Sequence, residues 1–297
     1  MAKPYILLLT SRPDGWPATR LRAASKALSV PLRTANPANA CLEIDGHELR
    51  VRYLGRILPT PSVVIPRLGP GNYENGFAML EHYESMGVPV CNSRESIEKA
   101  RDTVSSLLLL HVKGINVPKT ARLLSIKDIT TSRKFIPGPP WVLKTFTGAM
   151  GIGTMMVNAV DQLEAVAATI WALKEPILMQ EYVRSDDNSV SDIRTLVIGG
   201  EVVGAIRRIA HVGEFRSNVH KGATTEGIEL SKREISLAKK AANALGLEIA
   251  GVDWINTKDG PVVLEVNATP GFQGFERATG KDIAKEIIRY ARRVGGL

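Results

Sequence analysis

The stretch AGVDWINTKDGPVVLEVNATPG, residues 250–271, carries the pattern from which the fold of this chain is most directly predicted. Apolar residues dominate two segments within or beside it, Glu248–Ile255 and Pro261–Val266. Between them stand Asp259 and Gly260, a dipeptide typical of tight hairpin turns. The stretch therefore predicts two antiparallel strands joined by a short turn.

Three oxygen-bearing side chains lie on this expected hairpin. Glu265 and Asn267 are two residues apart on one strand, so their side chains share a face. The hairpin can place Asp253 of the other strand beside them. Two carboxylates and an amide oxygen suit a hard cation such as Mg²⁺, and the alternative is an ordinary polar outer face of a hairpin.

A second group of residues begins at Lys144, the last residue of the expected strand Trp141–Lys144. The loop Thr145–Gly153 follows, and the chain then returns as the expected strand Thr154–Val157. The glycines of the loop are Gly148, Gly151 and Gly153. Glycine lets backbone amides approach phosphate oxygens, and lysine supplies a positive charge, so the pattern favours a phosphate site. The alternative is an ordinary mobile surface loop, since the glycine spacing matches neither the P-loop nor the dinucleotide-binding fingerprint.

The first hundred residues alternate strand and helix signals, which predicts a small parallel sheet. The expected strands are Tyr5–Thr10, Val63–Ile65 and Val88–Val90, and the expected helices are Thr19–Leu28 and Phe77–Ser85. At Asn92 the chain changes character. Asn92 and Glu95 resemble a capping box that opens a helix to about Lys113, and Gly114 is placed to end it. This helix is expected to open a second unit.

Strand signals predominate after Thr120. Further expected strands are Ile177–Tyr182, Asp192–Ile198 and Glu201–Ile209, and further expected helices are Ala159–Trp171 and Asp282–Val294. The pair Gly199 and Gly200 predicts a hairpin turn. Ser231 and Glu234 form a capping box, which predicts the start of a helix that runs to about Leu245.

Other polar segments carry weaker signals. Gln180–Tyr182 could present backbone groups and a carboxylate to an adenine edge and a ribose, although such a segment is more often just the end of a strand. Asp192 and Arg194 alternate on one strand face, where the alternative is a surface salt bridge. Taken alone, Arg216–Asn218 is only part of a basic loop.

Composition limits the class of protein. The chain has 297 residues, 44% of them hydrophobic, which is enough for two or three packed units. No apolar run approaches the roughly 20 residues of a membrane span, so a cytoplasmic protein without membrane contact is expected. Cys41 and Cys91 fit no metal or redox spacing and are interpreted as reduced structural thiols. The net charge of +8 favours anionic partners, but nucleic acid is disfavoured because no aromatic residues interleave the basic ones.

Together these segments resemble the RimK-type ATP-grasp ligases over nearly the whole chain. The matching segments, in the family's order, are Val64–Arg67, Val142–Lys144, Gly148–Gly153, Gln180–Val183, Ser191–Arg194, Phe215–Gly222, Gly251–Asp253 and Leu264–Gly271. The resemblance implies an α/β fold of the α+β ATP-grasp type. It implies a pre-ATP-grasp domain at residues 1–93, then a central subdomain at 94–185 and a C-terminal subdomain with the metal site at 186–297, which together clasp ATP.

The resemblance also implies a role for each matching residue. ATP would be bound by Lys144, Gly148, Gly151, Gly153, Glu181, Tyr182, Asp192, Arg216, Ser217 and Asn218. The catalytic side chains would be Arg208, Arg216 and Asn218, and Mg²⁺ or Mn²⁺ would be held by Asp253, Glu265 and Asn267. The implied reaction forms an amide through an acyl phosphate and adds glutamate, or a similar amino acid, to the C-terminus of a protein or acidic peptide. A homo-oligomer is compatible with the sequence.

Two segments depart from the family's pattern. Thr103 follows Asp102 at a position where the family usually has lysine. At the positions of Arg207–Ile209 the family usually has an acidic residue and two arginines, and of these three residues only Arg208 matches an arginine of the family. These departures support an alternative function, a nucleotide-responsive binding or regulatory protein with lost or weak ligase turnover.

Overall fold

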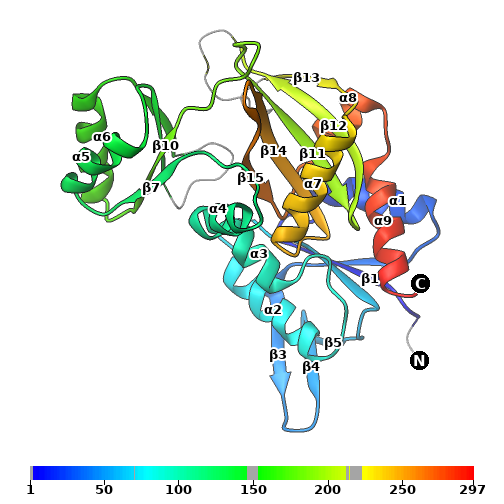
Figure 1. The fold of residues 1–297 in the computed structure, drawn as a ribbon. Coiled ribbons are helices and arrows are strands. Elements are labelled where there is room, and N and C mark those ends of the chain that lie inside the picture. The colour runs from blue at the N-terminus through cyan, green and yellow to red at the C-terminus, as the bar shows by residue number, and fades with distance from the viewer. Residues whose placement is uncertain (1–2, 70, 146–152, 212–213, 215–222) are drawn as a thin grey trace.

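The strands form four sheets within the part of the chain that the structure describes. The structure is a computed structural model, and it describes residues 3–69, 71–145, 153–211, 214 and 223–297 (Figure 1). Helices lie against these sheets, as the expected α/β architecture requires. No helix in the described ranges is both long and apolar enough to cross a membrane.

The largest sheet has five strands, all antiparallel to their neighbours, and belongs to the C-terminal part of the chain. In spatial order the strands are β13 (Thr224–Gly227), β12 (Glu201–Ile209), β11 (Ser191–Ile198), β14 (Ile249–Thr257) and β15 (Gly260–Asn267). The two expected hairpins are confirmed. Gly199 and Gly200 form the first turn with φ of 58° and 77°, a left-handed backbone that glycine adopts without a steric penalty.

The two faces of this sheet are covered by different helices. One face packs against α7 (Lys232–Ala244). The expected capping box at its start is confirmed, because the backbone N–H of Ser231 donates to Glu234 Oε2 at 2.7 Å. Apolar side chains of the other face pack against α8 (Gln273–Thr279) and α9 (Ile283–Val294).

The N-terminal part of the chain forms a three-stranded parallel sheet. In spatial order its strands are β2 (Leu32–Ala35), β1 (Ile6–Thr10) and β6 (Val63–Arg67). The expected helices are confirmed as α1 (Trp16–Ala27) and α2 (Tyr73–Ser85), each starting a little earlier than expected. The expected strand Val88–Val90 is wrong, since it reduces to one bridge between Val64 and Val90. Pro89 has no N–H to donate, so a longer ladder cannot form there.

A small antiparallel sheet beside it was not expected from the sequence. It contains β3 (Ala40–Ile44), β4 (Leu49–Tyr53) and β5 (Arg56–Leu58), and the 3₁₀ helix Pro37–Asn39 precedes it. These strands are short and rich in charged residues, so no apolar run marks them in the sequence.

The expected helix from Asn92 to about Lys113 is in fact two helices, α3 (Arg94–Arg101) and α4 (Thr103–Val112). The expected capping box is also wrong, because the cap of α3 is Ser93, whose hydroxyl accepts the backbone N–H of Ser96 at 3.1 Å. The break between the helices falls at Asp102, which leaves helical geometry and caps α4 with its own carboxylate. Gly114 follows α4 with φ of 67°, as expected of a residue that ends a helix.

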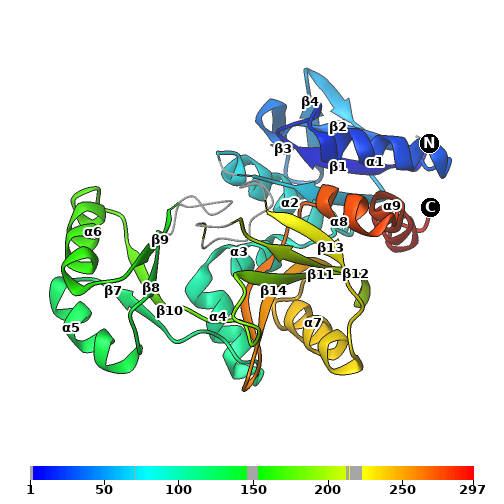
Figure 2. The same ribbon diagram turned by 90° about the horizontal axis from the view of Figure 1, so that it is seen from above.

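The middle of the chain forms a four-stranded sheet with a core of its own. In spatial order the strands are β7 (Thr120–Leu123), β10 (Ile177–Glu181), β8 (Trp141–Thr145) and β9 (Thr154–Val157). The helices α5 (Ile126–Phe135), which was not expected, and α6 (Val160–Ala172) pack on it. Both lie on the side away from the five-stranded sheet (Figure 2). The expected division of the chain at residues 94 and 186 stays a prediction.

One buried side chain, that of Asn92, ties the N-terminal part of the chain to the five-stranded sheet. Asn92 is 1% exposed, and its Nδ2 donates to the carbonyls of Ile249 and Ala268, each at 2.8 Å. Its Oδ1 accepts the backbone N–H groups of Glu248 at 2.7 Å and Ile249 at 2.8 Å. The amide therefore joins the start of β14 to the segment that follows β15.

We expect Asn92→Ala to lower the free energy of unfolding by about 3 kcal/mol, because buried backbone groups of two segments lose their partner. Urea denaturation monitored by circular dichroism measures the loss. Asn243→Ala, on the exposed side of α7, is the matched control and should change stability little. Equal midpoints for the two variants would show that the Asn92 contacts are not needed for stability.

Candidate functional site

A row of charged side chains crosses the five-stranded sheet on the face that also packs against α8 and α9. The register places Arg194 of β11 opposite Asp253 of β14, and Asp253 opposite Glu265 of β15. One pair further along, Asp192 of β11 lies opposite Arg208 of β12. Antiparallel pairing thus brings together five charged side chains from four strands.

Asp253 is the centre of this row. Arg194 binds it through both carboxylate oxygens, with Nε 2.5 Å from Oδ1, and Arg208 Nη2 lies 3.0 Å from its Oδ2. The Asp253 side chain is 3% exposed and that of Arg208 is 2% exposed. Burial alone would raise the pKa of the Asp253 carboxyl, but the charges of Arg194 and Arg208 outweigh burial and hold this pKa well below its usual range.

The alternative of a surface salt bridge between Asp192 and Arg194 is not the arrangement that the structure shows. Asp192 accepts from Arg208 Nε at 2.6 Å, and Arg194 instead pairs with Asp253. Both ion pairs run across strands and are largely buried. No local pattern predicts that Arg194 contacts a candidate metal ligand, because that contact depends on how two distant strands pair.

The three candidate metal ligands do come together. Asn267 Nδ2 lies 2.9 Å from Glu265 Oε1 and 3.4 Å from Asp253 Oδ2, so the amide group donates toward both carboxylates. Burial and the neighbouring charge of Asp253 raise the pKa of the Glu265 carboxyl, although 52% of its side chain is exposed. Two repelling carboxylates fit a divalent cation, and a half-turn of the amide would offer its oxygen as a further ligand.

Metal-binding side chains were also sought elsewhere. Within the described ranges, no group of three or more histidine, cysteine, aspartate and glutamate side chains has a metal-holding arrangement. The candidate set of Asp253, Glu265 and Asn267 has two carboxylates and one amide, so water or substrate oxygens would be needed to complete the coordination shell of a metal ion. Mg²⁺ commonly keeps water and substrate phosphate oxygens in its coordination shell, so a set of this size suits that ion.

Lys144 faces the same carboxylates from the four-stranded sheet. Burial lowers the pKa of its ammonium group, and the charges of Glu265 and Asp253 partly oppose that effect. The charges of Glu265 and Asp253 act on Lys144, so the three side chains lie near one another. The lysine end of β8 and the carboxylate end of the β14–β15 hairpin therefore form a single charged site.

Glu181 and Tyr182 lie at the far end of the four-stranded sheet from Lys144. In the ladder of β8 and β10, Glu181 pairs with Trp141 and Lys144 pairs with Leu178. Three residues of strand separate the two positions, or about 10 Å. Glu181 Oε1 accepts the backbone N–H of Lys119 at 2.9 Å, which fixes the carboxylate at the strand end.

Gly153 closes the glycine loop onto β8. Its carbonyl accepts the N–H of Thr145 at 3.0 Å, and its φ is 80°. The other candidate residues of the two loops, namely Gly148, Gly151, Arg216, Ser217 and Asn218, lie outside the described residues.

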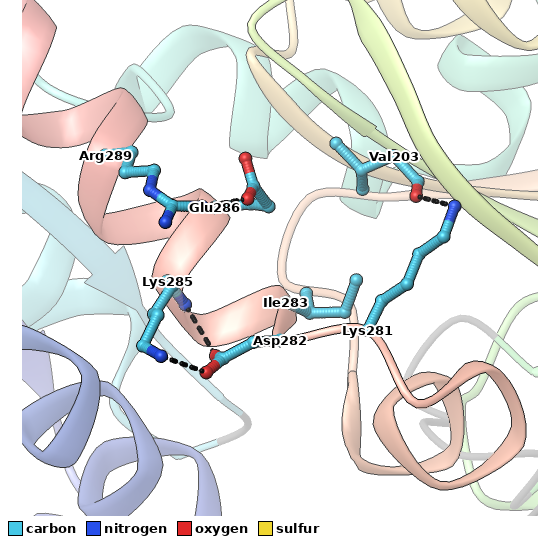
Figure 3. A pocket seen from close by; sticks show the side chains of 7 residues that line it. All are labelled: Val203, Lys281, Asp282, Ile283, Lys285, Glu286 and Arg289. Atoms are coloured by element: carbon cyan, nitrogen blue, oxygen red, sulfur yellow. Dashed lines mark hydrogen bonds and ion pairs between the residues drawn. The ribbon is translucent and has the colours of Figure 1, made fainter.

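Two surface hollows lie in the described part of the chain, and Asp192 of the charged row lines the second of them. The first, of about 490 Å³, is lined by Val203, Lys281, Asp282, Ile283, Lys285, Glu286 and Arg289 (Figure 3). Its cations have protein partners: Lys281 donates to the carbonyl of Val203 at 3.0 Å, Lys285 pairs with Asp282, and Arg289 pairs with Glu286. The hollow therefore has no free charge to recognise a ligand.

The second hollow, of about 390 Å³, lies beside the start of α7 and is rich in carboxylates. In this hollow the Glu234 carboxylate accepts the backbone N–H of Ser231 in the capping box of α7, and Asp187 pairs with Arg207, so both groups have structural roles. Neither hollow explains the buried charges of the site between the sheets.

Comparison with known proteins places these features in a wider context. Residues 5–97 match the family model of the RimK PreATP-grasp domain, and residues 100–291 match that of the RimK-like ATP-grasp domain. A protein named probable alpha-L-glutamate ligase from Methanococcoides burtonii is 38% identical over 290 residues, which cover 98% of this chain and 96% of that protein. Another of that name from Vibrio atlanticus is 36% identical over 285 residues, which cover 96% of this chain and 94% of that protein.

A solved structure gives the same result for the fold. The ATP-grasp ligase PsnB, complexed with a phosphomimetic variant of minimal precursor, Mg and ADP, superposes with a TM-score of 0.78 at 21% identity. The match covers 98% of this chain and 99% of that one. The expected ATP-grasp fold is confirmed.

We expect Arg208→Met to lower the free energy of unfolding by about 3 kcal/mol, because Asp192 and Asp253 would be left buried beside fewer positive charges. Adding Asp192→Leu to Arg208→Met should recover part of the loss. Arg289→Met, which breaks the exposed pair with Glu286, is the control and should cost less than about 1 kcal/mol. Guanidinium titration without added metal measures all three, and a loss for Arg208→Met no larger than the control's would contradict the buried ion pair.

Proposed function

This chain belongs to the family of RimK-like ATP-grasp ligases, and from that premise we propose that it uses ATP to join a carboxylate to the amine of glutamate or a similar amino acid. The observation that carries the proposal is the site between the two sheets. There, Lys144 faces Asp253 and Glu265, while Arg194 and Arg208 hold Asp253 in place. Such an arrangement suits a triphosphate with a divalent cation.

The names of similar proteins support the choice of substrates. Two relatives that match nearly the whole chain are named probable alpha-L-glutamate ligase, which supports glutamate as the amino-acid substrate. PsnB was solved with a precursor, Mg and ADP, which supports ATP, Mg²⁺ and a peptide or protein as acceptor. The net charge of +8 suits an acidic acceptor, and the acceptor's C-terminus is the proposed point of addition.

We assign the metal to Asp253, Glu265 and Asn267, with Mg²⁺ as the ion and Mn²⁺ as a substitute. The raised pKa of the Glu265 carboxyl supports this assignment, since repulsion from Asp253 is one of its causes and a cation between the carboxylates would relieve it. When bound, the ion supplies positive charge beside the phosphates.

ATP is assigned to the four-stranded sheet and the glycine loop. Glu181 and Tyr182 would contact the adenosine, and Lys144, about 10 Å further along the sheet, would contact the phosphates. An extended nucleotide spans such a distance. Gly148, Gly151 and Gly153 would cover the phosphates, and Asp192 would contact the nucleotide. The units at 1–93, 94–185 and 186–297 are part of the same proposal.

The proposed reaction has two steps. An oxygen of the acceptor carboxylate attacks the γ-phosphorus of ATP, the bond to the bridging oxygen breaks, and ADP leaves. The amine nitrogen then attacks the carbonyl carbon of the acyl phosphate, inorganic phosphate leaves, and the nitrogen loses a proton. Lys144 and Arg208 would stabilise the charge that develops on the phosphoryl oxygens, and Arg216, Ser217 and Asn218 would hold the phosphate or the reacting carboxyl.

The alternative is a nucleotide-responsive binding protein without turnover. Its support is Thr103, the first residue of α4, and Ile209, which ends β12 next to Arg208. ADP release with glutamate and a panel of acidic peptides separates the two functions. ADP that forms only when both substrates are present establishes ligase turnover, and binding without ADP release establishes the alternative.

We expect Glu265→Gln to lower kcat/KM for amide formation by about 100-fold or more, because the site loses a charged metal ligand that stabilises the transition state. The circular dichroism spectrum should stay unchanged. Glu201→Gln, at an exposed ion pair on the same sheet, is the control and should retain activity. Near-normal ADP release by Glu265→Gln at ordinary magnesium concentrations would refute the assignment.

A further inference from the structure

Arg67 brings a guanidinium group to the seam between the three-stranded parallel sheet and the segment that follows β15. It is the last residue of β6 and lies opposite Thr10, the last residue of β1. Its Nη2 donates to the carbonyl of Pro270 at 3.0 Å, and its Cζ lies 5.4 Å from the centre of the Phe272 ring. The side chain thus leaves the N-terminal sheet and reaches the C-terminal part of the chain.

Within the described ranges, Arg67 forms no ion pair with a carboxylate. Nearby Arg20 binds both Glu276, at 2.8 Å, and Asp282, at 2.6 Å. Burial lowers the pKa of Arg67 to about 10. A guanidinium has five N–H donors, and among the described residues Arg67 donates one of them, to Pro270. A recessed charge with spare donors is costly unless an anion completes it.

The position of Arg67 is one at which ligands bind. It lies at the carboxyl end of a parallel strand, the edge of an α/β sheet where ligands are commonly held. Pro270, its partner, comes three residues after the candidate metal ligand Asn267, and three residues of chain span at most about 11 Å. The guanidinium is therefore bonded to the same short segment of chain that carries a candidate metal ligand.

The surroundings of Arg67 fix the position of its guanidinium group. Phe272 is fully buried and contacts Trp16 with 5.1 Å between ring centres, so its ring is held in place under the guanidinium. α9 lies beside α1 (Figure 2), and the ion pair of Arg20 with Glu276 joins α1 to α8, the helix that Phe272 precedes. A planar guanidinium binds a carboxylate through two parallel hydrogen bonds, and the buried ring of Phe272 and the carbonyl of Pro270 hold this guanidinium in a fixed orientation.

We propose that Arg67 binds a carboxylate of the amine-bearing amino-acid substrate and so sets the preference for an amino acid with two carboxylates. This inference rests on the function proposed above. The amine attacks the acyl phosphate, so both carboxylates of glutamate stay unreacted and one of them is free to hold the substrate against Arg67. If Arg67 had only a structural role, through its bond to Pro270, its replacement would not change the preference among amino-acid substrates.

The test compares steady-state kinetics of wild type, Arg67→Gln and Arg67→Lys with an acidic peptide that the wild type accepts. We expect Arg67→Gln to raise KM for glutamate by about 10- to 100-fold while KM for ATP stays unchanged. Arg67→Lys keeps the positive charge but cannot form two parallel hydrogen bonds, so its KM for glutamate should lie between those of wild type and Arg67→Gln. Arg56→Gln, on exposed β5, removes the same charge and should behave as wild type. Thermal unfolding shows whether each variant is folded.

Substrate analogues identify the carboxylate. Glutamine lacks the side-chain carboxylate, and isoglutamine lacks the α-carboxylate. If Arg67 holds the side-chain group, Arg67→Gln should use glutamate and glutamine almost equally and still discriminate against isoglutamine. If Arg67 holds the α-carboxylate, Arg67→Gln should use glutamate and isoglutamine almost equally and still discriminate against glutamine. Unchanged discrimination against both analogues, or a fall in kcat alone, overturns the inference and leaves the proposed ligase function standing.

Calorimetric titration of glutamate in the presence of Mg²⁺ and ADP separates this inference from the proposed function. Absence of ADP release by the wild type with every amino acid overturns the proposed function. In that case, glutamate that binds wild type and not Arg67→Gln still supports Arg67 as a carboxylate site, whereas equal binding to both, or binding to neither, overturns it.

Discussion

The carboxylate of Asp253, held between the guanidinium groups of Arg194 and Arg208, is the interaction around which the candidate site is organised. A buried carboxylate is stable only when neighbouring charges and hydrogen bonds replace water. The two arginines do this from β11 and β12, so the pairing of these strands with β14 fixes the position of the carboxylate. The same register sets Glu265 beside it, where repulsion between the two acids favours a cation.

The face of the five-stranded sheet that packs against α8 and α9 is apolar toward one end and charged toward the other. Toward one end, Leu196, Ile206 and Ile249 are buried against α8 and α9. Toward the other end the same face carries the charged row. Gly251 lies at the transition, and a Cβ atom there would come within 2.8 Å of Pro270 Cβ. The missing side chain lets the segment after Asn267 cross β14 closely, which brings Pro270 to Arg67.

Three parts of the chain contribute to the candidate site. The side chains of Asn92 and Arg67 connect the N-terminal part to the five-stranded sheet, and the four-stranded sheet contributes Lys144. Asn92 joins the N-terminal part to both ends of the β14–β15 hairpin, and Arg67 reaches the same segment from β6. Lys144 comes from a sheet that has its own core, so its approach to Glu265 depends on how that sheet is placed against the rest. A ligase that brings a nucleotide, a carboxylate and an amine together needs contributions from several such units.

Local features of this protein were determined by the sequence itself. The hairpin of residues 248–266, the capping box at Ser231 and the turn at Gly199 and Gly200 each depend on residues a few positions apart, so periodicity and turn chemistry predict them. The grouping of Glu265 with Asn267 follows from strand alternation in the same way. Where a local signal was ambiguous, the prediction failed: Asn92 looked like a helix cap, but its amide has buried backbone partners more than 150 residues away.

Only the tertiary structure decided which charges meet. Arg194 is two residues from Asp192, yet it binds Asp253, 59 residues further along the chain, because β11 and β14 pair in that register. Arg67 contacts Pro270 across 203 residues, and no local pattern marks either contact. The physical reason is that strand register and the packing of units are set by the burial of apolar faces over the whole chain, whereas helix caps and tight turns are set by the hydrogen bonds of a few neighbouring residues.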